Sequence, residues 1–318
     1  MEVLVNPGGP SAVRSDDPAA AGDTVRGDRD LWDEVFASQN LVTALKRVER
    51  NRGAAGVDGV ETHELRDWCR QHWVTTRAAL DAGTYRPSPV RQVMIPKPDG
   101  GQRKLGVPTV LDRLIQQAIA QVLSPVFDPG FVPVSYGFRP GKSAHDAVKV
   151  ARLVIEQGYR WVVEVDLDAF FDRVNHDILI SRVARQVKDK RLLKLIRAYL
   201  EAGIMVDGVR QRAGGGTPQG SPLSPLLSNI MLDDFDQEFW GRGHRFVRYA
   251  DDIRVFVKSK RAAERVLEQS TRLLEQRLKL KVNVAKSVIA PAATAVLLGY
   301  GFYFTSSGVR LRIAPKAW

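Results

Sequence analysis

The chain contains the stretch FVRYADDIRVFV at residues 246–257, in which two adjacent acids, Asp251 and Asp252, interrupt a run of strand-forming residues. Aromatic and β-branched residues favour strands, so the stretch predicts two short strands around a tight turn at Ala250-Asp251. Aspartate is also an ordinary turn residue, because its side chain bonds the nearby backbone. From this stretch alone, the acids are either solvated turn formers or a site that uses two carboxylates.

A second stretch, WVVEV at residues 161–165, predicts a strand that ends at a third acid, Asp166. An unpaired carboxylate is costly to bury beside such an apolar run. Three carboxylates repel one another unless hard cations lie between them, and oxygen ligands of this kind suit Mg²⁺. Two such ions, roughly 3.5–4 Å apart, are a known solution for in-line phosphoryl transfer. We therefore expect Asp166, Asp251 and Asp252 to meet in space and to hold two Mg²⁺ ions, with Mn²⁺ as a substitute.

Composition and charge narrow the class of protein. The 318 residues are 44% hydrophobic, enough for a sizeable core, and 47 Lys and Arg against 36 Asp and Glu give a net charge of +11. This excess favours a polyanionic partner such as nucleic acid, although ribosomal and other basic proteins share it. The one cysteine, Cys69, rules out an intrachain disulfide, and no apolar run approaches the roughly 18 residues of a membrane span. With no secretory signal pattern, these features predict a cytoplasmic protein without a membrane partner.

The hydrophobic pattern along the chain mixes helices and strands. Residues 1–28 are rich in Gly, Pro, Ala, Asp and Ser, and we expect them to form a disordered tail. No regular alternation of strand and helix follows, so the sequence predicts the α+β class. Helical spacing marks the segments around 31–48, 65–82, 111–123, 178–199, 226–231 and 266–278, and strand patterns mark 85–107, 161–167, 246–257, 280–289 and 296–304.

The same stretches carry a resemblance to a known family. YADD at residues 249–252 resembles the metal-binding box of reverse transcriptases, and the surrounding segments are similar to the group II intron-encoded members. The ordered set of blocks is far more specific than any one tetrapeptide. The similar blocks are GVDG at 56–59, IPKPDGGQRKLGVP at 95–108, SYGFRPGKS at 135–143, VDLDAFFD at 165–172, GTPQGSPLSP at 216–225 and LLGY at 297–300.

The resemblance implies the fingers and palm of a right-hand polymerase, with the palm an antiparallel sheet backed by helices. It implies an N-terminal extension and fingers over residues 29–150 and mainly palm over residues 151–318, of which about 180–220 belong partly to the fingers. Full-length intron-encoded proteins continue into a helical thumb, or maturase domain. We expect this chain to lack that domain.

The resemblance also assigns the metal site residue by residue. Asp166, Asp251 and Asp252 would bind Mg²⁺, and the Leu167 backbone would add a carbonyl oxygen. Lys286 would lie beside the primer or the triphosphate. Four residues would support the shape of the motifs, namely Pro218, Gly220, Tyr249 and Ala250.

Other residues would contact the incoming nucleotide. Lys97 and Arg103 would grip the triphosphate, the lysine as a point charge and the arginine through its planar fork. Gln219 would hydrogen-bond the sugar or the base. Phe170 or Phe171, with Phe170 favoured, would place a ring beneath C2′ and exclude ribonucleotides. Further arginines are candidates for contacts to template phosphates, namely Arg139, Arg210, Arg212, Arg248 and Arg254.

These features predict an RNA-directed DNA polymerase of the group II intron type, which adds dNTPs to a DNA primer on an RNA template and takes part in intron mobility and splicing. The template could be its own intron RNA. One alternative is a CRISPR-associated or phage-defence reverse transcriptase with the same chemistry. Another is an RNA-binding splicing factor of the maturase kind with weak or lost polymerase activity. A metal-dependent nuclease would also use paired aspartates, but it leaves the nucleotide-gripping residues unexplained.

Overall fold

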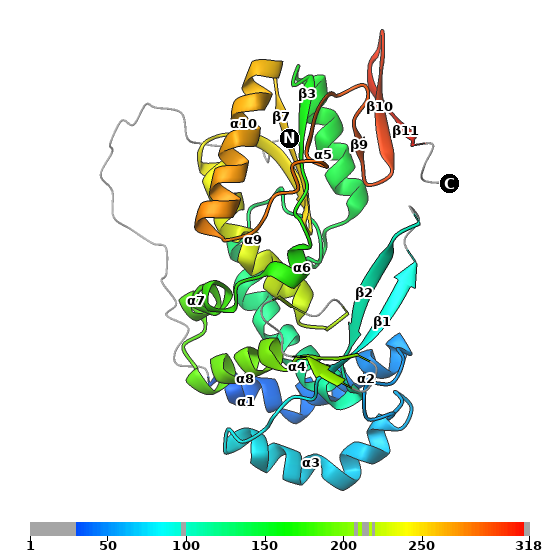
Figure 1. Ribbon diagram of the computed structural model, residues 1–318, viewed down its shortest axis with the longest axis vertical. Coiled ribbons are helices and arrows are strands. Elements are labelled where there is room, and N and C mark those ends of the chain that lie inside the picture. The colour runs from blue at the N-terminus through cyan, green and yellow to red at the C-terminus, as the bar shows by residue number, and fades with distance from the viewer. Residues whose placement is uncertain (1–29, 97–99, 207–208, 212–215, 218–219, 315–318) are drawn as a thin grey trace, which may run out of the picture.

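The computed structural model describes residues 30–96, 100–206, 209–211, 216–217 and 220–314. Its central sheet has four antiparallel strands in the order β6 (Arg245–Tyr249), β7 (Asp252–Val257), β3 (Trp161–Val165) and β8 (Val288–Pro291). Nearly every residue of β7 is buried, because helices cover the sheet. Helix α10 (Lys260–Arg272) packs against β3 and β7, and helix α5 (Ala144–Glu156) packs against β6 (Figure 1).

A helical unit lies beyond one end of this sheet, in the lower part of Figure 1. Helix α4 (Val110–Phe127) is its centre and contacts α1 (Leu31–Phe36) and α2 (Ser38–Asn51). Side chains cap α1, α4, α7 (His176–Gln186) and α8 (Lys190–Glu201), where Asp30, Thr109, Asn175 and Asp189 accept hydrogen bonds from free backbone N–H groups. The remaining helices of this part are α3 (Leu65–Asp81) and the short 3₁₀ helix η1 (Asp128–Gly130).

A second sheet projects from the helical unit and is separate from the central sheet (Figure 1). Strands β1 (Val90–Pro96) and β2 (Gln102–Val107) form an antiparallel hairpin, and β1 also runs parallel to β4 (Ile204–Val206), which pairs with β5 (Val209–Gln211). The base of the hairpin is buried, and the residues toward its tip are exposed. The hairpin is therefore anchored at one end only.

Helices α9 (Ser224–Gly241) and α6 (Phe170–Arg173) lie between the central sheet and the helical unit (Figure 1). Helix α9 contacts α4 and α7, and α6 is a single turn that follows β3.

A third sheet is formed by β11 (Gly308–Ile313), β10 (Tyr300–Thr305) and β9 (Val296–Leu297), and its strand β11 packs on α5. One π-helical turn, η2 (Leu273–Arg277), extends α10. In the described part of the chain, no helix combines the length and the apolarity that crossing a membrane requires.

The expected α+β class is confirmed, and so is the antiparallel sheet backed by helices. The predicted hairpins at residues 85–107 and 246–257 form as expected. The strand predicted near residues 280–289 was placed too early, because β8 begins at Val288. Before it, Val282 makes only an isolated bridge to Leu167. The predicted tail lies outside the described residues.

Candidate active site

The two adjacent acids lie at the tip of the β6–β7 hairpin. Tyr249 pairs with Asp252 at the last register position, so Ala250 and Asp251 form a two-residue turn. Ala250 adopts a left-handed φ of 56°, which two-residue hairpin turns require. The tight turn fixes Asp251 and Asp252 next to each other at the end of the sheet.

The third acid comes to the same end of the sheet from the neighbouring strand. Strands β3 and β7 are antiparallel, with Glu164 opposite Arg254 and Val165 opposite Ile253. One step further along this register, Asp166 lies opposite Asp252. Residues directly opposite in antiparallel strands project from the same face, so these two carboxylates share a face.

Hydrogen bonds hold the backbone of Asp166 in place. Its N–H donates to Ser287 Oγ at 3.1 Å, and its carbonyl accepts from the Asn283 N–H at 2.8 Å. The next residue, Leu167, forms an isolated antiparallel bridge with Val282. The strand end is therefore clamped on the side away from β7.

An ion pair already occupies part of the acidic face. Arg254 contacts Glu164 at 2.8 Å, and it also forms an ion pair with Asp252. The pKa of Asp252 is raised to about 6, and burial is the largest cause. The negative charges of Glu164, Asp251 and Asp166 contribute to this rise, and the positive charge of Arg254 opposes it.

Asp166 experiences a similar environment. Burial raises its pKa, the cationic Lys286 lowers it, and the negative charge of Asp251 raises it again. The charges of Asp166 and Asp251 therefore act on each other, as do those of Asp166 and Asp252. This crowding of partly buried carboxylates is the condition that a divalent cation relieves.

The donor set fits a hard divalent cation, because it consists of carboxylate oxygens on one sheet end. Within the described ranges, however, no three His, Cys, Asp or Glu side chains already stand in a metal-binding arrangement. Asp252 is turned to the Arg254 guanidinium instead. Binding an ion here requires Asp252 to exchange this guanidinium for the metal.

Of the other predicted site residues, the structure brings some near the acids and leaves others apart. Lys286 is exposed and acts electrostatically on Asp166. Arg103 is exposed on β2 of the separate hairpin, opposite Ile95. Three residues lie outside the described part of the chain, namely Lys97, Pro218 and Gln219.

The segments on both sides of Gln219 pass close to the hairpin and to α6. The Thr217 N–H donates to the Phe171 carbonyl at 2.5 Å. Gly220 has a φ of 104°, and an added Cβ would lie 3.0 Å from the Gly106 carbonyl oxygen of β2. Glycine is thus required at Gly220 both by its conformation and by the close approach of another backbone.

The two phenylalanines after β3 are packed edge to face, with ring centroids 5.1 Å apart. Phe170 is 3% exposed and belongs to the main hydrophobic core, whereas Phe171 is partly buried at its edge. Both follow Ala169, whose φ of 48° turns the chain sharply after Asp168. This turn places both rings directly after the Asp166 strand end.

Three of the arginines named as candidates for template phosphates have partners inside the protein instead. Arg248 is 0% exposed and bonded inside the protein, and Arg139 is bonded to Asp128 and to backbone carbonyls. Arg254 is committed to Asp252 and Glu164. The local sequence around an arginine does not show whether its guanidinium faces solvent or pairs with an aspartate far along the chain. Of the other two, Arg210 donates to the Ala202 carbonyl, and Arg212 lies outside the described residues.

Sequence reasoning missed two contributors to this site. Ser287 holds the Asp166 backbone, and Glu164 holds Arg254 beside Asp252. The signal for Glu164 was present, because it is the one charge within an apolar strand and needs a partner there. Nothing in the local sequence distinguishes Ser287.

The comparisons with known proteins agree with this geometry. The family described as "Reverse transcriptase (RNA-dependent DNA polymerase)" matches residues 95–302, which include β2, the β6–β7 hairpin and all three acids. The chain belongs to the reverse transcriptase family.

Relatives of this reverse transcriptase include intron-encoded proteins. It is 35% identical over 289 residues to Protein YkfC of Escherichia coli strain K12, covering 78% of this chain and 76% of YkfC. It is 41% identical over 160 residues to the group II intron-encoded protein LtrA of Lactococcus lactis subsp. cremoris, covering 50% of this chain and 26% of LtrA. The reverse transcriptase thus matches about a quarter of the length of LtrA.

A solved structure shares the fold at low identity. The apo telomerase from Candida tropicalis matches with a TM-score of 0.54 and 14% identity, covering 79% of this chain and 53% of that chain. Together with the family match, this supports the fingers and palm of a right-hand polymerase. The chain is a reverse transcriptase of the group II intron type, an RNA-directed DNA polymerase, and its family generally uses divalent metal ions and RNA templates.

Proposed function

We propose that this reverse transcriptase adds dNTPs to a DNA primer with two Mg²⁺ ions held by Asp166, Asp251 and Asp252, Mn²⁺ being able to substitute. The observation that carries the proposal is the register of β3 and β7, which sets Asp166 opposite Asp252 and beside the Asp251 turn. The ions would supply charge for activating the primer 3′-hydroxyl and for neutralising the triphosphate. The carboxylates position these charges, and the Leu167 carbonyl is a further oxygen ligand.

The chain's own side chains then bind and orient the nucleotide. Arg103, with Lys97, binds the triphosphate from the β1–β2 hairpin, and Arg103 is exposed on β2. Lys286 lies on the Asp166 side and balances the negative charge. Gln219 bonds the sugar or the base. Thr217, two residues before it in the chain, donates its N–H to the Phe171 carbonyl.

Phe170 or Phe171 excludes the ribose 2′-hydroxyl. A gate must present its ring to the sugar, and Phe171, partly buried at the edge of the core, keeps more accessible surface than Phe170, which is 3% exposed. Pro218 and Gly220 shape the nucleotide-facing loop, while Tyr249 and Ala250 shape the metal-facing turn.

The larger biological role follows from charge and relatives. The net charge of +11 suits binding to a polyanionic RNA template. One such template would be the intron RNA that encodes a protein of this type. We assign residues 29–150 to the N-terminal extension and fingers and residues 151–318 mainly to the palm, with about 180–220 partly in the fingers. We further propose a role in intron mobility and splicing in a cytoplasmic setting.

Primer extension tests the proposed function. Purified protein with Mg²⁺, an RNA template, a DNA primer and dNTPs is expected to extend the primer, and Asp251→Ala is expected to abolish extension. The matched control is Asp234→Asn, which changes an aspartate of α9 that pairs with Arg182 and Arg185 away from the turn. Extension that persists in Asp251→Ala would refute the assignment.

A further inference from the structure

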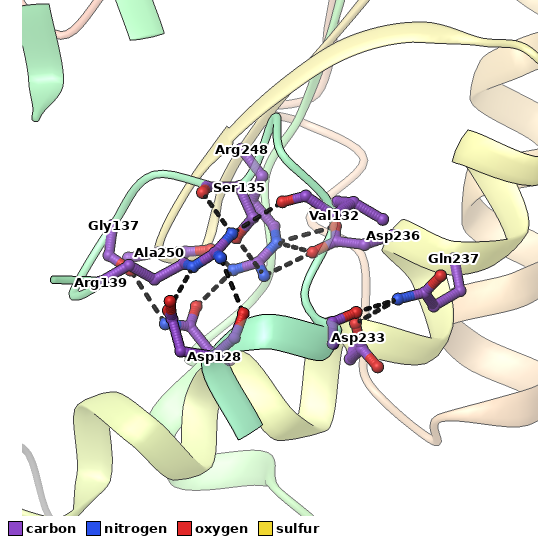
Figure 2. Close-up of polar contacts among 12 residues, drawn as sticks. Asp128, Val132, Ser135, Gly137, Arg139, Asp233, Asp236, Gln237, Arg248 and Ala250 are labelled. Atoms are coloured by element: carbon purple, nitrogen blue, oxygen red, sulfur yellow. Dashed lines mark hydrogen bonds and ion pairs between the residues drawn. The ribbon is translucent and has the colours of Figure 1, made fainter. Parts of the chain in front are cut away.

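One arginine lies behind the metal-facing turn rather than in front of it. Arg248 is fully buried, and all five of its N–H donors are used. Its Nε and Nη2 donate to the Asp236 carboxylate at 2.9 and 2.5 Å, and Nη2 also donates to Ser135 Oγ at 2.8 Å. Its Nη1 donates to Asn229 Oδ1 at 2.9 Å and to the Ala250 carbonyl at 2.8 Å (Figure 2).

The Ala250 carbonyl is the bond that matters for the site. Ala250 is the left-handed residue of the turn and directly precedes Asp251, so fixing its peptide plane fixes the start of the acidic pair. Asn229, which binds Arg248, also donates to the Gly137 carbonyl at 2.9 Å. A Cβ on Gly137 would lie 2.2 Å from the Ala250 nitrogen, so this backbone is pressed against the turn.

A buried ion pair of this kind is weak evidence for a role in stability alone. Removing two charges from water costs about as much as their attraction returns, and well-packed apolar residues often replace such pairs without loss. What apolar residues cannot replace is a planar fork that holds four different groups at fixed angles. The Arg248 network has that property, and one of its four groups is the turn itself.

We propose that Arg248, oriented by Asp236, Asn229 and Ser135, is a positioning residue that holds the Ala250 turn so that Asp251 and Asp252 present their carboxylates to the metal ions. This inference rests on the proposed function, because it acts through the same acids. Arg248 touches neither nucleotide nor metal. Its effect is on the affinity of the acids for the ions.

Electron paramagnetic resonance with Mn²⁺ as the probe measures this effect without any catalytic turnover. Arg248→Lys keeps the charge and loses the fork, so we expect a loss of Mn²⁺ affinity of about tenfold or more. The matched control, Arg182→Lys, alters a partly buried arginine whose partner Asp234 lies two residues from Asp236 on α9, and we expect wild-type Mn²⁺ affinity. Thermal melting of both variants shows whether each is folded at the temperature used.

Primer extension supplies the second measurement. If Arg248 acts through metal affinity, raising the Mn²⁺ concentration restores kcat in Arg248→Lys at a temperature where melting shows the variant to be folded without added Mn²⁺, so that the recovery does not come from refolding. Wild-type Mn²⁺ affinity in a folded Arg248→Lys protein overturns the inference while leaving the proposed function intact. Failure of the wild-type protein to bind Mn²⁺ overturns the proposed function and the inference with it.

Milder variants cover the case in which Arg248→Lys does not fold. Ser135→Ala and Asn229→Ala each remove one hydrogen bond to the same guanidinium. Each is expected to weaken Mn²⁺ binding by a smaller factor and in the same direction. Unchanged affinity in both folded variants would overturn the inference equally well.

Discussion

Arg254 forms an ion pair with Asp252, the same carboxylate that the proposed metal site requires. Its other partner is Glu164, 2.8 Å away on the neighbouring strand. The guanidinium can therefore release Asp252 without losing all of its negative partners. Arg254 therefore neutralises Asp252 when no ion is bound, and it keeps Glu164 as its partner when an ion binds Asp252.

Glu164→Gln is expected to weaken metal binding. Arg254 then keeps Asp252 as its only anionic partner, and one negative charge near the ions is lost, so both effects act in the same direction. A partly exposed pair is worth about 1 kcal/mol, which corresponds to about fivefold in Mn²⁺ affinity. Glu156→Gln, which breaks the Arg152 pair on α5, is the control and should leave the affinity unchanged. Equal affinities in all three proteins would show that Glu164 has no part in the exchange.

The metal-free protein should lose stability as the pH rises. The pKa of Asp252 is raised from 3.8 to about 6 on folding, so between these pH values the folded state binds more protons than the unfolded state. The free energy of unfolding then falls as the pH rises from about 4 to about 6, by at most about 3 kcal/mol. Urea unfolding of Asp252→Asn in a chelator should lack this part of the slope. A wild-type slope in that variant would contradict the assigned pKa.

Gly137→Ala should displace the Ala250 turn, because the backbone of Gly137 packs directly against it. The added Cβ would lie 2.2 Å from the Ala250 nitrogen, so the two backbones must separate. Displacement of a catalytic group by about 1 Å costs about 100-fold in rate, and a loss of that size is expected in primer extension. Gly130→Ala is the control, because its Cβ meets nothing within 4 Å. Extension by Gly137→Ala at the control rate would mean that the contact does not position the acids.

Substituting the sugar gate should admit ribonucleotides. Phe170→Val and Phe171→Val each remove one ring of the edge-to-face pair, and the variant that lacks the gate is expected to incorporate rNTPs at least about 10-fold more readily relative to dNTPs. Competition between dCTP and rCTP on one template measures the ratio. If neither substitution changes it, sugar selection does not reside in this pair.

The hairpin arginine should affect nucleotide affinity more than folding. Arg103 is exposed on β2, so Arg103→Ala removes a triphosphate ligand without opening the core. The KM for dNTP is expected to rise about 10-fold, in line with the loss of one charge-assisted contact. Lys104→Ala, on the opposite face of the same strand, should change KM less than about twofold. A similar effect of both changes would indicate a general loss of charge rather than a specific grip.

The acidic hairpin was predictable because its signal is local. Strand formers on both sides of Ala250 and Asp251 fix a turn, and the turn fixes the acids. The approach of Asp166 was not predictable from spacing, because it depends on the β3–β7 register across 85 intervening residues. The family resemblance, rather than the residues alone, connected these two stretches.

Two other features were not predicted from the sequence, each for a different physical reason. Helix α5 was not predicted, although its sequence carries a signal. The Ser143 side chain caps the first turn by accepting from the Asp146 N–H, and Ala147 and Val154 lie on the buried face. The burial of Arg248 had no local signal, because its partner Asp236 lies on a preceding helix and Ser135 lies 113 residues away. A long-range polar network depends on tertiary contacts that no sequence window contains.

The most direct test is crystallographic. Crystals soaked in Mn²⁺ should show anomalous scattering from ions bound by Asp166, Asp251 and Asp252, with the Arg254 guanidinium turned from Asp252 toward Glu164. Crystals in which Asp252 stays paired with Arg254 at saturating Mn²⁺, and in which any ions bind elsewhere, would contradict the account.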